Sequence, residues 1–172
     1  NHLNATLHAH ESSCKVCGFG KYAPTAASRI CTECEAGLFL ADDKTNHANH
    51  DAIADCLICA SGKYSDVGAQ GCLNCDKGLF ITDNSGDKAK HASKQSCVVC
   101  PKGKHTNNID GTTVCTDCPK GTWLADDGVE AYNHLDINNC LVCDAGRIAT
   151  SVGSSTCVDC PAGRSLIDDK GD

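Results

Sequence analysis

Cysteine is the residue type in this sequence with the clearest chemistry, since the 172 residues contain 16 cysteines arranged as eight Cys-x-x-Cys pairs. Cys56, Cys59, Cys72 and Cys75 make up two successive pairs. Two such pairs can hold one tetrahedral zinc ion, because a two-residue gap lets both thiolates of a pair reach the same metal. A pair can also act as a redox centre when its thiolate is stabilised, and cysteines of a secreted chain form structural disulfides. The spacing within a pair leaves these three uses of sulfur open.

The spacing between the pairs favours disulfides. A short gap of 12 to 14 residues alternates with a long gap of 21, so the pairs do not group into fours as separate zinc modules would. A redox centre needs one exposed pair at a helix N-terminus, which eight pairs in a helix-poor chain do not match. With 4% aromatic residues and no methionine, the chain also has little apolar surface to offset the cost of ordering it. Disulfide cross-links are therefore expected to replace a large core.

The cysteine pairs mark a tandem repeat. The first cysteines of alternate pairs, Cys14, Cys56, Cys97 and Cys140, give a period of 41 to 43 residues. We assign residues 14–55, 56–96 and 97–139 to three repeats, 140–172 to an incomplete fourth repeat and 1–13 to the tail of a preceding one. Repeats of this kind stack on their neighbours along one axis. The predicted fold is a small disulfide-rich, elongated rod with short β-ladders, loops and little helix; only 45–54 and 129–135 are expected to form a helical turn.

A glycine follows each pair after two residues, and an aromatic residue often follows that glycine, as in Gly62-Lys63-Tyr64. Glycine tolerates the backbone conformations of tight turns, so a turn is expected beside the sulfurs. The ring two residues later is expected to lie over a neighbouring disulfide.

Each long gap, or long loop, carries an acidic couplet after its glycine and a histidine six residues before the next pair. The couplets are Asp42-Asp43, Asp83-Asn84, Asp126-Asp127 and Asp168-Asp169, and the histidines, with one more in phase before Cys14, are His8, His50, His91 and His134. The couplets are expected to form Asx-turns on a solvated edge. The alternative is calcium at Asp42, Asp43, Asp126 and Asp127, although two carboxylates supply few of the six to eight oxygens that calcium takes. The histidines are expected to pack or to form hydrogen bonds, with metal binding or a pH-sensitive contact between repeats as alternatives.

The cysteines of one pair are expected to bond outward, because a bond within Cys-x-x-Cys would close a strained ring and leave the loops untied. Adjacent pairs could bond first to first and second to second, as Cys56 to Cys72 with Cys59 to Cys75. In the other arrangement, the sequential ladder, the second cysteine of each pair bonds the first cysteine of the next. Its bonds are Cys17–Cys31, Cys34–Cys56, Cys59–Cys72, Cys75–Cys97, Cys100–Cys115, Cys118–Cys140 and Cys143–Cys157. We favour the sequential ladder because Cys14 and Cys160 would then pair outside this window, as expected for a segment of a longer array.

The repeats resemble known extracellular modules. The segment from Cys17 to Cys31, CGFGKYAPTAASRIC, resembles the first module of a tumour-necrosis-factor-receptor cysteine-rich domain, and Cys34 to Cys56 resembles the following module in its one-disulfide form. The segment Cys56 to Cys75 is equally similar to the ephrin-receptor-like cysteine-rich repeats of secreted protist and algal surface proteins. The resemblance implies an extracellular, elongated rod and, in the receptor family, the sequential ladder. Receptors carry a few irregular modules, however, whereas the period here is steady, which favours a structural role.

Charge and composition exclude several other classes of function. A net charge of −7 without a Lys/Arg cluster argues against binding to nucleic acid or to anionic membranes, and no apolar run approaches the roughly 20 residues that span a bilayer. No nucleophile, base and acid stand out together, so we expect neither an enzyme nor a cofactor. A sequon at Asn4 is compatible with a glycan. We expect a segment of a secreted filament, hair or stalk whose partners are copies of itself or sister filament proteins; the alternative is a ligand-binding or adhesion ectodomain of a receptor.

Overall fold

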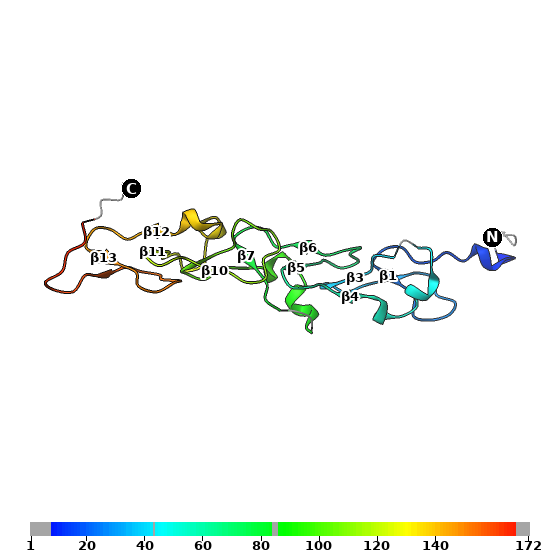
Figure 1. Cartoon of the computed structure of the whole chain (residues 1–172). Helices are drawn as coiled ribbons and strands as arrows, with labels where there is room; N and C mark the ends of the chain where they lie inside the picture. Colours follow the sequence, from blue (N-terminus) through cyan, green and yellow to red (C-terminus); the bar gives the residue numbers. More distant parts are fainter. Residues whose placement is uncertain (1–7, 43, 84–85, 168–172) are drawn as a thin grey trace.

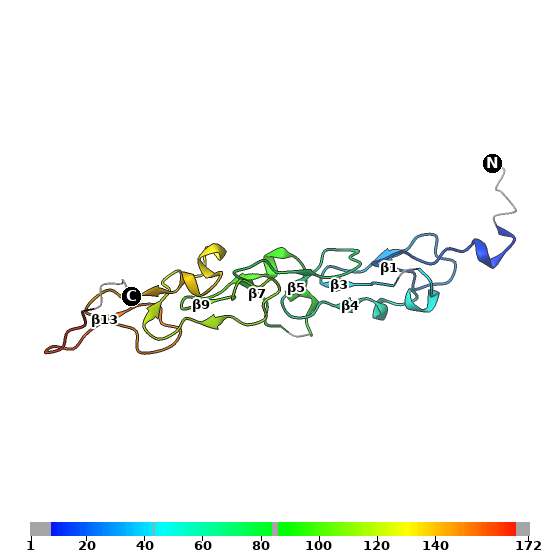
Figure 2. The same cartoon turned by 45° about the horizontal axis from the view of Figure 1, so that its top comes forward.

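The computed structural model describes residues 8–42, 44–83 and 86–167 and shows an elongated rod (Figure 1). The chain advances along the rod from the blue N-terminal end to the red C-terminal end, and Figure 2 shows the same extended shape from a second direction. In the described ranges the regular structure consists of two-residue strands and single 3₁₀ turns, with no α-helix. This is the predicted fold class, a disulfide-rich rod of short ladders and loops. The described residues also contain no helix that is long and apolar enough to cross a membrane.

The strands pair two by two in antiparallel ladders, each formed by successive strands of the chain. The strands are β1 (Lys21–Tyr22), β2 (Thr32–Glu33), β3 (Leu38–Phe39), β4 (Leu57–Ile58), β5 (Lys63–Tyr64), β6 (Leu73–Asn74), β7 (Leu79–Phe80), β8 (Val98–Val99), β9 (Lys104–His105), β10 (Thr116–Asp117), β11 (Thr122–Trp123), β12 (Leu141–Val142), β13 (Arg147–Ile148) and β14 (Val158–Asp159). β1 pairs with β2 across a short gap, and β3 pairs with β4 across a long loop; this alternation continues to β13 and β14. The two unequal gaps of the sequence thus become two kinds of hairpin.

Short 3₁₀ turns occur in the long loops and before the first cysteine of alternate pairs. They are η2 (Glu11–Ser13), η3 (His47–Asn49), η4 (Ile53–Asp55), η5 (Lys88–His91), η6 (Lys94–Ser96), η7 (Ala131–His134) and η8 (Ile137–Asn139). Helical turns were expected only within 45–54 and 129–135, so the expectation was too narrow. In several of these turns, such as η3, η5 and η8, an Asn or Asp side chain at the N-cap accepts a main-chain N–H, as Asp87 does from Ala89.

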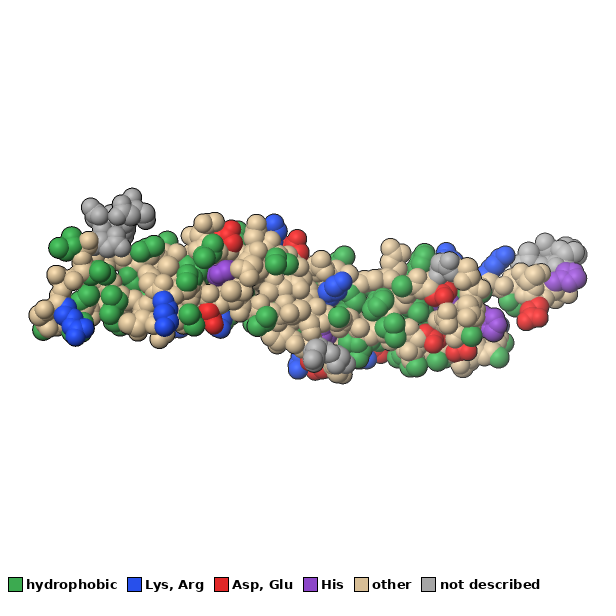
Figure 3. All heavy atoms as spheres, viewed as in Figure 1, with side chains coloured by type: hydrophobic (Ala, Val, Ile, Leu, Met, Phe, Trp, Pro, Cys, Tyr) green, Lys and Arg blue, Asp and Glu red, His purple; other side chains and the backbone are tan. Residues whose placement is uncertain are grey.

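Seven disulfides run along the rod, and their pairing is that of the sequential ladder. Cys14 and Cys160 are free. Cys34, Cys59 and Cys118 are fully buried in the rod, whereas Cys31, Cys72 and Cys157 are partly exposed. Tyr22 clusters with Cys34 and Cys56, which places its ring beside the disulfide of the next loop. Apolar side chains are scattered along the visible face in Figure 3, and buried residues form small local clusters in place of one core.

Main-chain contacts join each repeat to the next. The Gly153 N–H donates to the carbonyl of Cys118 at 2.8 Å, and the Leu124 N–H donates to the carbonyl of Ser154 at 3.0 Å. Gly103 has a φ of +76° and lies so close to Gly153 that a Cβ built on it would be 2.1 Å from the Gly153 carbonyl oxygen. Glycine is needed at position 103 for two reasons, the left-handed turn and the approach of the next repeat.

Candidate functional site: a repeated aspartate–histidine clasp

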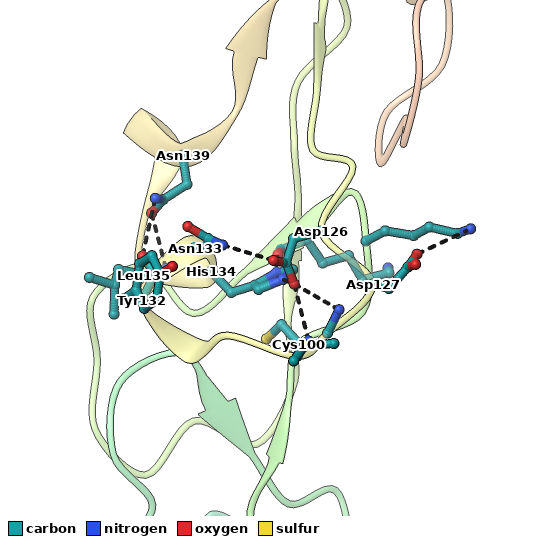
Figure 4. Close-up of polar contacts among 12 residues, drawn as sticks. Cys100, Asp126, Asp127, Tyr132, Asn133, His134, Leu135 and Asn139 are labelled. Atoms are coloured by element: carbon teal, nitrogen blue, oxygen red, sulfur yellow. Dashed lines mark hydrogen bonds and ion pairs between the residues drawn. The ribbon is translucent and has the colours of Figure 1, made fainter.

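Each described long loop brings its histidine against the first aspartate of its acidic couplet, a contact that we call the Asp–His clasp. In the loop of residues 119–139 the clasp consists of Asp126 and His134 (Figure 4). His134 is fully buried at the end of η7, and its Nε2 lies 3.0 Å from Oδ1 of Asp126. Its Nδ1 lies 2.7 Å from the carbonyl oxygen of Lys104 in β9. The clasp thereby fastens a long loop to the short hairpin that precedes it along the chain.

The loop's own backbone holds the Asp126 carboxylate in place. The N–H groups of Gly128 and Val129 donate to Oδ1 at 2.9 and 3.1 Å, which is the hydrogen bonding of an Asx-turn. The Asn133 side-chain amide donates to Oδ2 at 2.8 Å. These hydrogen bonds, the first of them from Asn133 and then that from His134, hold the pKa of Asp126 far below its ordinary value of 3.8. The carboxylate is therefore ionised at neutral pH.

The first long loop repeats this arrangement. His50 Nδ1 lies 2.7 Å from the Lys21 carbonyl oxygen, and its Nε2 lies 3.0 Å from Oδ1 of Asp42. The Asn49 amide donates to Oδ2 of Asp42 at 2.7 Å. The pKa of Asp42 is lowered, chiefly by the hydrogen bond from Asn49, while partial burial opposes the shift and His50 adds to it.

The second long loop departs from the pattern at one residue. Lys90 stands where the other two described loops have asparagine, and its Nζ lies 3.9 Å from Oδ1 of Asp83. His91 keeps the contact of its Nδ1 with the Lys63 carbonyl at 2.7 Å, but its Nε2 is 3.6 Å from Oδ2 of Asp83. Both of these facing atoms are buried and lack a hydrogen-bond partner among the described residues. This clasp is the loosest of the three.

The chemistry open to a clasp follows from what surrounds its imidazole. One ring nitrogen faces a carbonyl oxygen and the other faces a carboxylate. Neither nitrogen of His134 is then free to take a proton from a substrate or to bind a metal. Among the described residues, no group of three or more His, Cys, Asp or Glu side chains is placed to hold a metal ion. The arrangement can hold a loop in one conformation, and protonation of the aspartate in acid would weaken it.

The aspartates that the sequence suggested as calcium ligands have different surroundings in the structure. The carboxylates of Asp42 and Asp126 accept the hydrogen bonds of the clasps. The Asp127 side chain, in contrast, is 80% exposed, and the Lys102 ammonium group lies 3.9 Å from it. The two aspartates of the 126–127 couplet therefore have different partners. Asn4, Asp43, Asn84, Asp168 and Asp169 lie outside the described residues. His8 is described and exposed, and it makes no clasp with the described residues.

The sequence predicted packing or hydrogen bonds for the histidines but did not identify the aspartate as their partner. The partner is the first residue of the couplet, eight positions earlier in each case: Asp42 with His50, Asp83 with His91 and Asp126 with His134. The constant spacing of eight residues was visible in the sequence. The contact of each histidine with a carbonyl about 29 residues earlier was not, because it depends on how the long loop folds back.

A groove lies beside each clasp, on the side of the aromatic residue after the loop's glycine. The groove beside Asp126 has a volume of about 600 Å³ and includes Trp123 in its wall. Its counterparts beside Asp42 and Asp83 include Phe39 and Phe80 and measure about 520 and 620 Å³. The same surface feature therefore recurs beside all three described clasps.

Comparison with profiles of known protein families and with curated protein sequences finds no match for this chain.

Proposed function

We propose that this chain is a structural segment of a secreted, disulfide-laddered repeat protein that forms an extracellular filament, hair or stalk by self-association. The observation that carries the proposal is the continuity of the rod. Each repeat is bonded to the next by an equivalent disulfide and equivalent main-chain hydrogen bonds, while a clasp fixes the long loop within each repeat, so that each further repeat adds length. Function then resides in extension and in resistance to unfolding and proteolysis.

The covalent chemistry supports an extracellular setting. Disulfides persist in oxidising environments and are reduced in most cytosols, and small secreted domains use them where a hydrophobic core is insufficient. The buried clusters of this rod are small and contain the sulfurs themselves. In the chain-entropy model each bond that closes a loop of about 15 residues contributes about 3 kcal/mol, so a series of them can replace a core.

The clasps fit a structural role better than catalysis. Both ring nitrogens of His50 and His134 already face an oxygen atom of the protein, and the grooves beside the clasps are open at the surface of the described rod. The proposed partners are therefore copies of the chain or sister filament proteins, with any glycans at the surface.

Sedimentation and electron microscopy of the oxidised protein test this function. We expect association that increases with concentration and thin linear particles, and we expect loss of the rod shape after reduction of the disulfides. A protein that stays monomeric at every concentration and binds a discrete soluble protein ligand would instead support the receptor or adhesion ectodomain.

A further inference from the structure

The grooves beside the three described clasps are built from the same positions of the repeat. Each is lined by the aromatic residue after the loop's glycine and by the apolar residue after the cysteine that ends the loop: Phe39 with Leu57, Phe80 with Val98 and Trp123 with Leu141. Each is also lined by the clasp aspartate and by the residue before the clasp histidine: Asp42 with Asn49, Asp83 with Lys90 and Asp126 with Asn133. The three grooves are therefore one kind of site, repeated along the rod.

The apolar part of each groove is accessible from outside. Leu57 and Leu141 are 57% and 54% exposed, and the aromatic residues of all three grooves are partly exposed. An aromatic ring in such a position offers a flat apolar face, and a ligand that covers it removes that face from water.

The polar part of the groove keeps unused hydrogen-bonding groups. In the third groove Oδ2 of Asp126 accepts a single hydrogen bond, that of Asn133, and the Asp126 side chain is 17% exposed. The Asn133 side-chain oxygen and the exposed Asn138 amide make no hydrogen bond to a described residue. A carboxylate accepts hydrogen bonds, and an amide both donates and accepts them. The groove can therefore bind hydroxyl groups of either hydrogen-bonding sense.

The charges around the grooves favour a neutral ligand. Every groove contains the carboxylate of its clasp, which repels an anion. In the second groove the Lys90 ammonium group lies 3.9 Å from Oδ1 of Asp83 and opposes a cation. Lysine and asparagine at this position both donate N–H groups, so an uncharged ligand with hydroxyl groups suits all three grooves.

The grooves also face different directions. The turn η7, beside the third groove, lies on the upper edge of the rod in Figure 1, whereas η5, beside the second groove, lies on the lower edge. A second rod that lies straight along one side cannot fill both of them. A small ligand or a flexible chain can enter each groove separately.

We propose that each groove binds a sugar unit of a neutral polysaccharide. A pyranose ring has a face of C–H groups, which packs on the aromatic ring, and a rim of hydroxyl groups, which bond to the aspartate and the amides. Groove volumes of about 520 to 620 Å³ are within the range of small-molecule sites. This binding goes beyond the proposed structural function, because it attaches the rod to carbohydrate around it.

Fluorescence provides a local test, since Trp123 is the single tryptophan of the chain and lines the third groove. The oxidised full chain is titrated with cellohexaose, laminarihexaose and mannohexaose up to about 10 mM, with hexagalacturonate as the anionic control. At least one neutral probe is expected to move the emission to shorter wavelength in a saturable manner, because the sugar displaces water from the indole, and hexagalacturonate is expected to have no effect. Calorimetry with the same neutral probe is expected to give three sites per chain, one for each groove.

Substitutions separate the grooves from one another. Phe39→Ala is expected to lower the number of calorimetric sites from three to two and to leave the Trp123 response unchanged, which also shows that the rest of the rod has folded. Trp123→Ala is expected to weaken binding at the third groove at least about tenfold, and Trp123→Phe is expected to restore most of it. Tyr132→Ala is the matched control, because Tyr132 is a 63% exposed aromatic residue of the same loop that does not line the groove, and its affinity is expected to stay unchanged.

Three results would overturn the carbohydrate site. They are the lack of a saturable response to all three neutral probes, an equal response to hexagalacturonate, and a Trp123 shift that follows protein concentration without sugar, which would show a second copy in the groove. Sedimentation distinguishes this failure from failure of the proposed function. Self-association of a chain that binds no sugar would leave the filament standing and remove only the carbohydrate site.

Discussion

Gly103 has a left-handed backbone angle and also lies close to the next repeat. The effects of these two features on stability can be measured separately with a matched pair of substitutions, Gly103→Ala and Gly146→Ala. The two glycines occupy equivalent turns with φ +76° and +77°, and each donates its N–H to a carbonyl about twenty residues later. A Cβ on Gly103 would lie 2.1 Å from the carbonyl oxygen of Gly153, whereas a Cβ on Gly146 meets no described atom within 4 Å. Only the first substitution therefore pushes two repeats apart.

The expected magnitudes follow from these contacts. Alanine in the left-handed region costs roughly 1 to 2 kcal/mol, and this cost applies to both variants. Relief of the clash in Gly103→Ala also weakens two main-chain hydrogen bonds beside the contact, that from the Cys118 N–H to Gly103 within the repeat and that from the Gly153 N–H to Cys118 between repeats, both 2.8 Å. At about 1 kcal/mol for each bond, we expect Gly103→Ala to lower the free energy of unfolding by about 2 kcal/mol more than Gly146→Ala.

Urea unfolding with the disulfides intact measures this difference. The chain has one tryptophan, Trp123, which lies between the two glycines in the sequence and reports on this part of the rod by fluorescence. Because a repeat array need not unfold in a single step, amide hydrogen exchange at Gly153 provides a local second measure. Equal shifts of the unfolding midpoint for both variants, with unchanged exchange at Gly153, would refute the close approach as a determinant of stability.

Two further predictions concern the clasps. Because the folded pKa of Asp126 is depressed below 3.8, its contribution to stability is complete above about pH 4 and is lost as the pH falls below that value, so the urea midpoint followed by tryptophan fluorescence should drop in acid. Asp126→Asn should reduce this acid dependence and the exposed control Asp127→Asn should leave it unchanged; identical pH profiles for the two variants would contradict the assignment. Lys90→Asn should supply the amide donor that the Asp83 carboxylate lacks and raise the local stability by up to about 1 kcal/mol, seen as slower amide exchange over residues 86–96. Unchanged or faster exchange there would show that the asparagine is not what tightens the other two clasps.

The rod itself was predictable because it follows from the spacing of the cysteine pairs in the sequence. The alternation of short and long gaps, together with an apolar content too small for a core, leads to a chain of disulfide-closed loops, and the structure has this architecture. The ring of Tyr22 beside the Cys34 and Cys56 sulfurs follows from the Gly-x-aromatic pattern in the same way. These features depend on residues that are close in the sequence or repeat at a fixed period.

The parts that sequence reasoning did not reach depend on contacts between distant segments. Gly103 was expected to serve a local turn, and its contact with Gly153, in the next repeat, became visible only in three dimensions. His134 was expected to form hydrogen bonds, but its carbonyl partner on Lys104 lies 30 residues earlier and no spacing rule connects them. The aspartate partner could have been found, since both residues recur in every described long loop at a constant separation.

The disulfides and the clasps act on different aspects of the rod. A disulfide stabilises mainly by limiting the unfolded chain, and the long loop that it closes stays free to adopt many conformations. The clasp removes that freedom, because it ties the loop to the preceding hairpin through the Lys104 carbonyl and to itself through Asp126. The conformation of the long loop therefore depends on the clasp as well as on the disulfide that closes it. The repeat that contains His91 has the same disulfides but a carboxylate 3.6 Å from the ring, so it is the segment where the rod is expected to bend most easily.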